Sequence, residues 1–234
     1  PRSTPWPYTT LVRSGCRDQQ RDWQGALLDF PVNKVVCVGS NYADHIKEMG
    51  GQKAAEPVLF IKPETALCDF RQPIAVPKDL GLVHHEIELA VLIGTPLKQA
   101  TEDRVANAIA GYGVALDLTL RDLQSAFRQA GQPWEKAKGF DGSCPMSGFI
   151  PVSEFGDAQQ AALRLEINGE MRQAGNTRDM LTPLLPLIAY MSRFFTLRAG
   201  DIILTGTPHG VGPLKAGDEI VATLNDKQVS SRVI

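Results

Sequence analysis

Two glutamates stand two residues apart at the start of an apolar stretch. Glu86 and Glu88 open the segment 86–93, which is short, contains β-branched residues and is followed by glycine, as in a buried strand. Because strand side chains alternate, both carboxylates point to one face, with their backbones about 7 Å apart. Two like charges so placed resist burial unless they share a proton, line a wet cleft or bind a cation. Carboxylate oxygens are the ligands that a hard divalent cation prefers.

A third acid could complete a metal site. Asp117 ends the apolar stretch 113–116, where a predicted strand passes into the next helix. Together with Glu86 and Glu88 it would offer Mg²⁺ three oxygen ligands. The alternative is a solvent-facing edge strand, or acids that form salt bridges with lysine or arginine. The three residues alone leave both interpretations open.

His45 and Glu48 lie three residues apart on a predicted short helix, 42–49. This spacing puts them on one face, where a carboxylate can orient and charge an imidazole. Such a pair suits general acid–base chemistry near neutral pH, although a simply solvated histidine is the alternative. Lys138 stands among aromatic residues and glycines in 134–140, where it could bind a substrate carboxylate or be a solvated charge.

The segment 204–213 places three glycines after a predicted strand. Glycine lets backbone N–H groups approach an anion closely. The segment lacks the Gly-Lys-Ser/Thr of a phosphate-binding loop, and the chain has no G-x-G-x-x-G dinucleotide fingerprint. It also has no G-x-S-x-G elbow, which argues against a serine hydrolase.

Bulk composition predicts a soluble globular protein and gives no reason to expect nucleic-acid or membrane partners. The 234 residues are 43% hydrophobic and 21% charged, with a net charge of −2. No apolar stretch approaches the roughly 18–20 residues of a membrane span, and no secretory signal is visible at the start. The four cysteines contain no C-x-x-C pair, so we expect a reduced, cytoplasmic protein.

Hydrophobic patterning predicts the elements that must position these residues. Ser40-Asn41 and Thr119 are predicted helix N-caps, and Asn168-Gly169 a hairpin turn. Strands outnumber helices and come in clusters, which indicates an α+β domain with a strand-rich core. Residues 1–22 are predicted to be a flexible arm or an expression remnant, and 23–234 a single catalytic domain. The predicted strands are 35–39, 58–61, 86–93, 111–118, 163–167, 202–204 and 219–224, and the predicted helices are 42–49, 101–108, 119–130 and 184–195.

Six sets of segments form an ordered series from about residue 33 to 213: VGSNYADHIKE (38–48), EPVLFIKP (56–63), HEIELAV (85–91), GY (111–112) with DLTLRDLQ (117–124), KGFD (138–141) and TGTPHGVG (205–212). The ordered set is specific. In this order the segments resemble the fumarylacetoacetate hydrolase family, in particular its small single-domain members that handle acylpyruvates and oxaloacetate.

The resemblance implies a mixed β-sandwich roll with peripheral helices, usually a homodimer. It implies Mg²⁺ or Mn²⁺ on Glu86, Glu88 and Asp117, an acid–base dyad of His45 and Glu48, and catalytic participation of Lys138. Ser40 stands where many relatives have arginine, which removes a possible cation near the entrance. The substrate contacts that it implies are Arg121, Gln124, Gly206 and Thr207.

These expectations lead to a Mg²⁺-dependent enzyme that acts on a small 2-oxo acid through a stabilised enolate. We favour keto–enol tautomerisation of oxaloacetate, because the chain lacks the extra N-terminal domain of larger hydrolases and tautomerisation asks least of the site. Hydrolysis of an acylpyruvate C–C bond and decarboxylation of oxaloacetate are the alternatives. A non-catalytic protein that binds metal and 2-oxo acid is the alternative from another class, and the His45–Glu48 pair argues against it.

Overall fold

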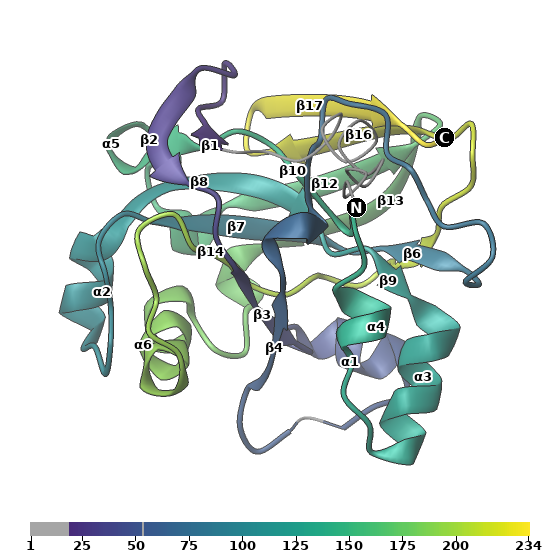
Figure 1. Ribbon diagram of the computed structural model, residues 1–234, viewed down its shortest axis with the longest axis horizontal. Helices are drawn as coiled ribbons and strands as arrows, with labels where there is room; N and C mark the ends of the chain where they lie inside the picture. Colours follow the sequence, from purple (N-terminus) through teal and green to yellow (C-terminus); the bar gives the residue numbers. More distant parts are fainter. Residues whose placement is uncertain (1–18, 53) are drawn as a thin grey trace, which may run out of the picture.

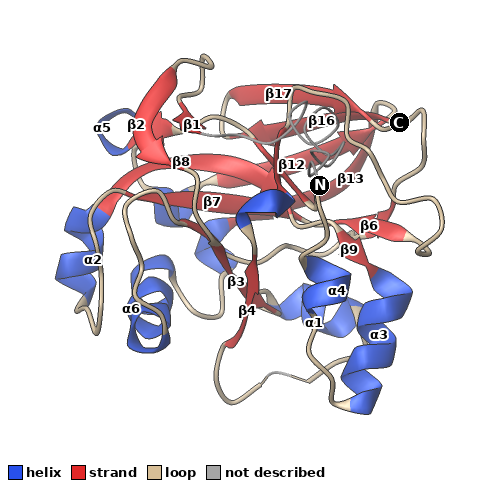
Figure 2. Ribbon diagram, viewed as in Figure 1, coloured by secondary structure: helices blue, strands red, loops and turns tan. Residues whose placement is uncertain are grey.

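The computed structural model describes residues 19–52 and 54–234, and Figures 1 and 2 show the arrangement of the elements. The strands are β1 (Gln19–Arg21), β2 (Leu27–Pro31), β3 (Val35–Gly39), β4 (Val58–Lys62), β5 (Leu67–Asp69), β6 (Val83–His85), β7 (Ile87–Ile93), β8 (Ile109–Leu116), β9 (Thr119–Leu120), β10 (Cys144–Met146), β11 (Ile150–Pro151), β12 (Ala162–Ile167), β13 (Glu170–Asn176), β14 (Ile202–Leu204), β15 (Gly212–Pro213), β16 (Glu219–Leu224) and β17 (Lys227–Arg232). The α-helices are α1 (Ala43–Glu48), α2 (Glu102–Ala108), α3 (Arg121–Ala130), α4 (Glu135–Lys138), α5 (Val152–Phe155) and α6 (Leu184–Phe194). Short 3₁₀ turns are η2 (Glu64–Ala66), η3 (Ala158–Gln160) and η4 (Thr177–Asp179).

Strand β7 lies in the middle of the largest sheet. Across the described residues this sheet runs in the order β4-β3-β14-β7-β8-β10-β5, with β11 also paired to β8. A second, antiparallel sheet, β13-β12-β16-β17, packs against it through β12 on β7 and β16 on β8. Figure 1 shows the large sheet curling beneath the second one. The prediction of an α+β sandwich roll is therefore confirmed.

Both faces of β7 are buried, which explains its nearly unbroken apolar sequence. Leu89 and Val91 face the core shared with the second sheet. Ala90 and Leu92 face a smaller core on the opposite side. Since strand side chains alternate, Glu88 has the parity of Ala90 and Leu92 and points toward the smaller core.

The helices lie at the periphery of the sheets, as expected. Figure 2 shows α1, α3 and α4 grouped below β6 and β9, while α2 and α6 pack together at the opposite end of β7. The first group carries the polar side chains, whereas α6 buries Leu187, Ile188 and Met191. No helix within the described residues is long and apolar enough to cross a membrane.

The predicted N-caps are wrong. Helix α1 begins after Tyr42 without a side-chain cap, and α3 begins after Leu120, because Thr119 is in β9. The Asn41 side chain instead donates to the carbonyl of Thr205 at 2.9 Å and accepts from the backbone N–H of Thr182 at 2.8 Å. Distant backbone groups thus compete successfully with the local cap, a competition that sequence spacing does not reveal.

The chain ends add structure that patterning did not indicate. Residues 1–18 of the predicted arm lie outside the described residues, but Gln19–Arg21 pairs with β2, and the buried Gln20 amide donates to the Gly200 carbonyl. Strand β17 was not predicted, since its sequence KQVSSR is mostly polar. Only Val229 of β17 is buried, and the strand is an edge of the second sheet.

Gly113 of β8 gives a test of this packing. Gly113 lies on the strand that leads to Asp117. A Cβ at this position would lie 2.8 Å from the Gly148 carbonyl oxygen and 2.9 Å from Ser147 Oγ. We expect Gly113→Ala to lower the free energy of unfolding by about 1–3 kcal/mol, as overpacked cores do. Urea denaturation measures it. Gly51→Ala is the control, because a Cβ at Gly51 meets only ordinary contacts from 3.6 Å outward. Equal stability of the two variants would contradict the packing described.

Candidate active site

The pairing of β7 with β8 brings three acids together. Ile87 lies opposite Leu116, and the Asp117 N–H continues the ladder by donating to the Glu86 carbonyl at 2.9 Å. One carboxylate oxygen each from Glu86, Glu88 and Asp117 lie within 4.8 Å of one another, and all three residues are buried. These three residues are called the acid triad below. Their hard oxygen donors, converging in a buried site, fit a divalent cation.

Lys138, at the end of α4, lies against the acid triad. Its ammonium group donates to Glu86 Oε2 at 2.9 Å, to Asp117 Oδ2 at 2.7 Å and to Thr119 Oγ1 at 2.7 Å. All three N–H donors of the lysine are therefore in use. Burial opposes the charge on Lys138, but the neighbouring Asp117 and Glu86 carboxylates outweigh it and raise the pKa of the lysine.

Lys62 is a second buried cation, which sequence analysis did not single out. It ends β4, is fully buried, and lies 2.8 Å from Asp117 Oδ1, although without hydrogen-bond geometry. Its ammonium group donates to the carbonyls of Ser143 at 3.0 Å and Leu118 at 3.3 Å, and also to that of Lys138. The only signal in the sequence is a lysine that ends an otherwise apolar strand.

Arg121 and Gln124 sit on the first turns of α3, facing the acid triad. The Arg121 guanidinium donates to Glu86 Oε1 through Nη2 and to Gln124 Oε1 at 2.7 Å through Nη1. Both side chains are buried. The structure thus brings together these two predicted substrate contacts and joins them to the acids.

Glu86 and Glu88 lie in different electrostatic environments. Burial opposes ionisation of Glu86, but the charges of Lys138 and Arg121 hold its pKa well below the ordinary range. Burial raises the pKa of Glu88, and the charges of Asp117 and Glu86 raise it further, well above the ordinary range. Glu88 forms no ion pair within the described residues, so it gains most from a bound cation.

His45 and Glu48 form a contact on α1. His45 Nδ1 lies 3.3 Å from Glu48 Oε2, and Glu48 Oε1 accepts the backbone N–H of Gly210 at 2.9 Å. The imidazole is buried, whereas the Glu48 side chain is 30% exposed. His45 is also among the groups that lower the pKa of Glu86, after the larger contributions of Lys138 and Arg121, so the imidazole lies within electrostatic reach of the acid triad.

Residues 205–212, called the glycine loop below, run alongside β7. The Gly206 N–H donates to Glu88 Oε2 at 2.7 Å, and Thr207 Oγ1 donates to the Ile87 carbonyl at 2.7 Å. Gly206 has a φ of +94°, and a Cβ would lie 2.7 Å from the Asn41 Cβ, so glycine is required. The predicted substrate contacts Gly206 and Thr207 are therefore adjacent to the acids, and each already binds β7.

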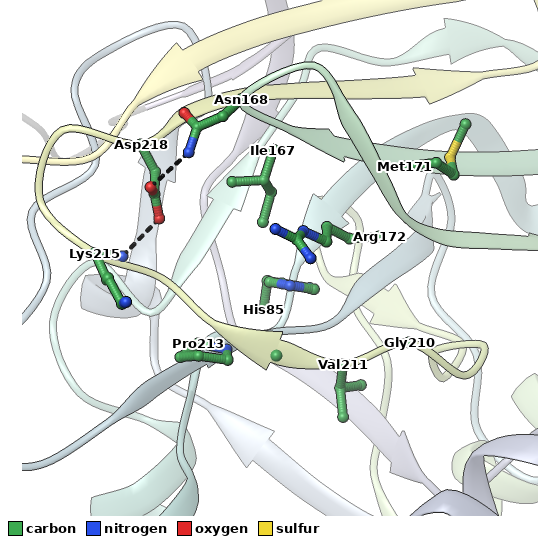
Figure 3. Close-up of a pocket in the computed structure, with 11 residues that line it drawn as sticks. His85, Ile167, Asn168, Met171, Arg172, Gly210, Val211, Pro213, Lys215 and Asp218 are labelled. Carbon is green, nitrogen blue, oxygen red and sulfur yellow. Dashed lines mark hydrogen bonds between the residues drawn. The ribbon is translucent and has the colours of Figure 1, made fainter.

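A separate cavity of about 560 Å³ is bordered by Gly210, Val211 and Gly212 of the glycine loop. Figure 3 shows its lining, to which Arg172 of β13, Lys215 and the His85 imidazole contribute. The cavity is lined by none of the acid triad. It is therefore distinct from the site that the acids define.

The chain belongs to the fumarylacetoacetate hydrolase family, and it is an enzyme of that family. Residues 34–233 match the family described as fumarylacetoacetate (FAA) hydrolase C-terminal. The region covers the acid triad, the His45–Glu48 pair and the glycine loop.

Among its relatives are proteins named as oxaloacetate tautomerases. One is oxaloacetate tautomerase YcgM of Escherichia coli (strain K12), 67% identical over 217 residues, which are 92% of this chain and 99% of that protein. Another is the mitochondrial oxaloacetate tautomerase FAHD1 of Homo sapiens, 44% identical over 82% of this chain and 86% of that protein.

Solved structures of the family share the fold. A fumarylacetoacetate hydrolase family protein from Yersinia pestis CO92 is 78% identical, with a TM-score of 0.92 over 92% of this chain and 100% of that one. Fumarylpyruvate hydrolase from Pseudomonas aeruginosa, in complex with Mn²⁺ and pyruvate, is 37% identical, with a TM-score of 0.86 over 91% and 94% of the two chains.

Glu88→Gln gives a test of cation binding that needs no substrate. In EDTA we expect the variant to be at least as stable as the wild type, because an amide at this position cannot add a buried charge beside Glu86 and Asp117. With Mg²⁺ at about 100 times its Kd, the wild type should gain about 2.7 kcal/mol, and the variant clearly less. Urea denaturation with and without Mg²⁺ measures both. An equal gain in the two proteins would show that Glu88 is not a ligand.

Proposed function

We propose that the protein catalyses the keto–enol tautomerisation of oxaloacetate, with Mg²⁺ (or Mn²⁺) held by Glu86, Glu88 and Asp117. One observation carries the proposal: the glycine loop binds Glu88 through Gly206 and Glu48 through Gly210, so one segment links the acid triad to the acid–base pair. The names of the tautomerase relatives support the same substrate.

The cation would supply Lewis-acid stabilisation of negative charge as it develops on the substrate oxygens. His45 takes the proton from C3 of oxaloacetate, and a proton is returned to the oxygen on C2, so the enol forms without loss of atoms. Glu48 orients the His45 imidazole and stabilises its protonated form. Arg121 and Gln124 contribute donors for the substrate carboxylates, and Lys138 for an oxygen near the reacting carbons.

Hydrolysis of an acylpyruvate is the second candidate. Its support is the likeness to the Pseudomonas aeruginosa fumarylpyruvate hydrolase, whose structure contains Mn²⁺ and pyruvate. In that reaction His45 would activate a water for attack on the distal carbonyl. Decarboxylation of oxaloacetate would need the same charge stabilisation but no proton removal at C3. A protein that only binds metal and 2-oxo acid would have no use for the part-buried His45–Glu48 contact.

The proposal also includes that the protein forms a homodimer and is located in the cytoplasm. Light scattering during size-exclusion chromatography measures the first: a mass near twice 25.5 kDa supports a dimer, and a mass near 25.5 kDa contradicts it. Cell fractionation measures the second.

Ultraviolet absorbance of oxaloacetate with Mg²⁺ separates the reactions. We expect the enol signal to relax within seconds, faster than in a Mg²⁺-only control, while total oxaloacetate is preserved. Loss of total oxaloacetate as pyruvate appears would instead indicate a decarboxylase. Activity no faster than the control, with cleavage of acylpyruvates, would reverse the order of the two candidates.

His45→Ala tests the acid–base pair. General acid–base catalysis is typically worth 10²–10⁴-fold, so we expect kcat to fall by about that factor. Mg²⁺ and oxalate binding, followed by calorimetry, should stay nearly unchanged. Lys47→Ala is the control, since Lys47 lies on the same helix with an 80% exposed side chain. Turnover that survives in His45→Ala would show that another residue moves the proton.

A further inference from the structure

Gln173 lies outside the segments that suggested the site, yet it touches the site's framework. It belongs to β13, in the sheet that carries none of the acid triad. Its side chain is buried, and it reaches across to the start of β7 and to the glycine loop. The residue therefore connects two sheets at the point where the acids are held.

Four hydrogen bonds occupy the whole amide of Gln173. Its Oε1 accepts the Ile87 N–H at 3.0 Å and pairs with His85 Nδ1 at 2.9 Å. Its Nε2 donates to Thr207 Oγ1 at 2.8 Å and to the Pro208 carbonyl at 2.9 Å. An amide offers two donors and commonly accepts two bonds, so nothing is left unsatisfied.

Backbone partners fix which way the amide points. The Ile87 N–H can only donate and the Pro208 carbonyl can only accept, so oxygen and nitrogen of Gln173 cannot be exchanged. His85 Nδ1 is then the donor toward Gln173 Oε1, and the Thr207 hydroxyl accepts from Gln173 Nε2. The same hydroxyl donates to the Ile87 carbonyl, which closes a ring of three residues.

Close packing accompanies these bonds. A Cβ on Gly210 would lie 2.1 Å from the Arg172 carbonyl oxygen, and one on Gly175 would lie 2.6 Å from Pro208 Cβ. Each of these close approaches needs a glycine, one in the glycine loop and one in β13. The two segments therefore pack against each other without an intervening side chain at either glycine. Figure 3 shows Gly210 and Val211 passing beside Arg172 and His85.

We infer that Gln173 is a positioning residue, which sets the distance between the two glutamates that flank Ile87 and the glycine loop. Ile87 stands between the two glutamates of the acid triad, and Thr207 follows Gly206, whose N–H binds Glu88. The loop continues to Gly210, which holds Glu48. The consequence for turnover rests on the proposed function, whereas the consequence for the loop does not.

Gln173→Met removes all four bonds at similar volume. Gln159→Met is the matched control: Gln159 Oε1 accepts the Leu184 N–H at 2.7 Å and its Nε2 donates to the Thr177 carbonyl, so it too joins backbone segments, but it contacts none of the acid triad. The first readout is hydrogen–deuterium exchange of wild type and both variants. We expect exchange across residues 205–210 to accelerate at least about tenfold in Gln173→Met and less than about twofold in Gln159→Met.

The second readout is Mn²⁺ affinity, followed by electron paramagnetic resonance, together with kcat and KM for oxaloacetate. We expect Gln173→Met to weaken Mn²⁺ binding about tenfold and to lower kcat, while Gln159→Met changes both less than about twofold despite a comparable loss of stability. Unchanged loop exchange in Gln173→Met would overturn the inference. Faster loop exchange in Gln173→Met, together with a wild type that shows no activity on oxaloacetate, would uphold the inference and refute the proposed function.

Gln173→Glu keeps the test decisive if the methionine variant fails to fold. A glutamate retains acceptors for Ile87 and His85 but loses the donor to Thr207 and Pro208. Exchange should then accelerate in the glycine loop and stay unchanged at 86–88. If the glycine loop of this variant exchanged as slowly as in the wild type, the inference would be overturned.

Discussion

The burial of three acids beside one another is the constraint on which the rest of the site depends. The three carboxylate oxygens lie within 4.8 Å of one another, and two unit charges at that limit repel by roughly 3–4 kcal/mol at the effective dielectric typical of proteins. Ionisation of all three acids would create three such pairs and destabilise the β7–β8 ladder beside them. The fold offsets the repulsion with Lys62, Lys138 and Arg121, which come from β4, α4 and α3.

That requirement explains why small elements pack where they do. Helix α4 has four residues and a short sequence, EKAK, yet its last residue makes three bonds to the site. Its position is tight, since a Cβ on Gly139 would lie 3.1 Å from Pro63, next to Lys62. Removing one partner from a buried ion pair typically costs 3–5 kcal/mol, so the cations are constrained as strongly as the acids.

Short-range spacing was enough to predict the parts of the site that lie within one element. The two-residue spacing of Glu86 and Glu88 predicted a shared face, and the three-residue spacing of His45 and Glu48 predicted their contact. The Asn168-Gly169 turn was also predicted, and it joins β12 to β13. In each case the geometry is set by local backbone periodicity.

Contacts between distant segments could not be predicted in this way. Lys62 meets Asp117 across 55 positions of sequence, and Gln173 meets Ile87 across 86. The lysine that ends an apolar strand and the glutamine within β13 carry no local indication of the distant residue that each one meets. Asn41 is an example of a local prediction that failed for the same reason. Its side-chain amide binds distant backbone groups and is therefore not used as a helix cap.

The saturation of Lys138 connects charge balance to catalysis. Its three donors are bound to Glu86, Asp117 and Thr119, so in this arrangement none is free for a substrate. A divalent cation held by the acid triad would compete with Lys138 for the Glu86 and Asp117 acceptors. Each bond that the lysine gave up would free a donor for a substrate oxygen. Glu88, which has no ion pair within the described residues, offers the cation a ligand without displacing any lysine. The catalytic role proposed for Lys138 would therefore depend on cation binding, and the buried charges that offset one another in the fold would also be the groups that act on the substrate.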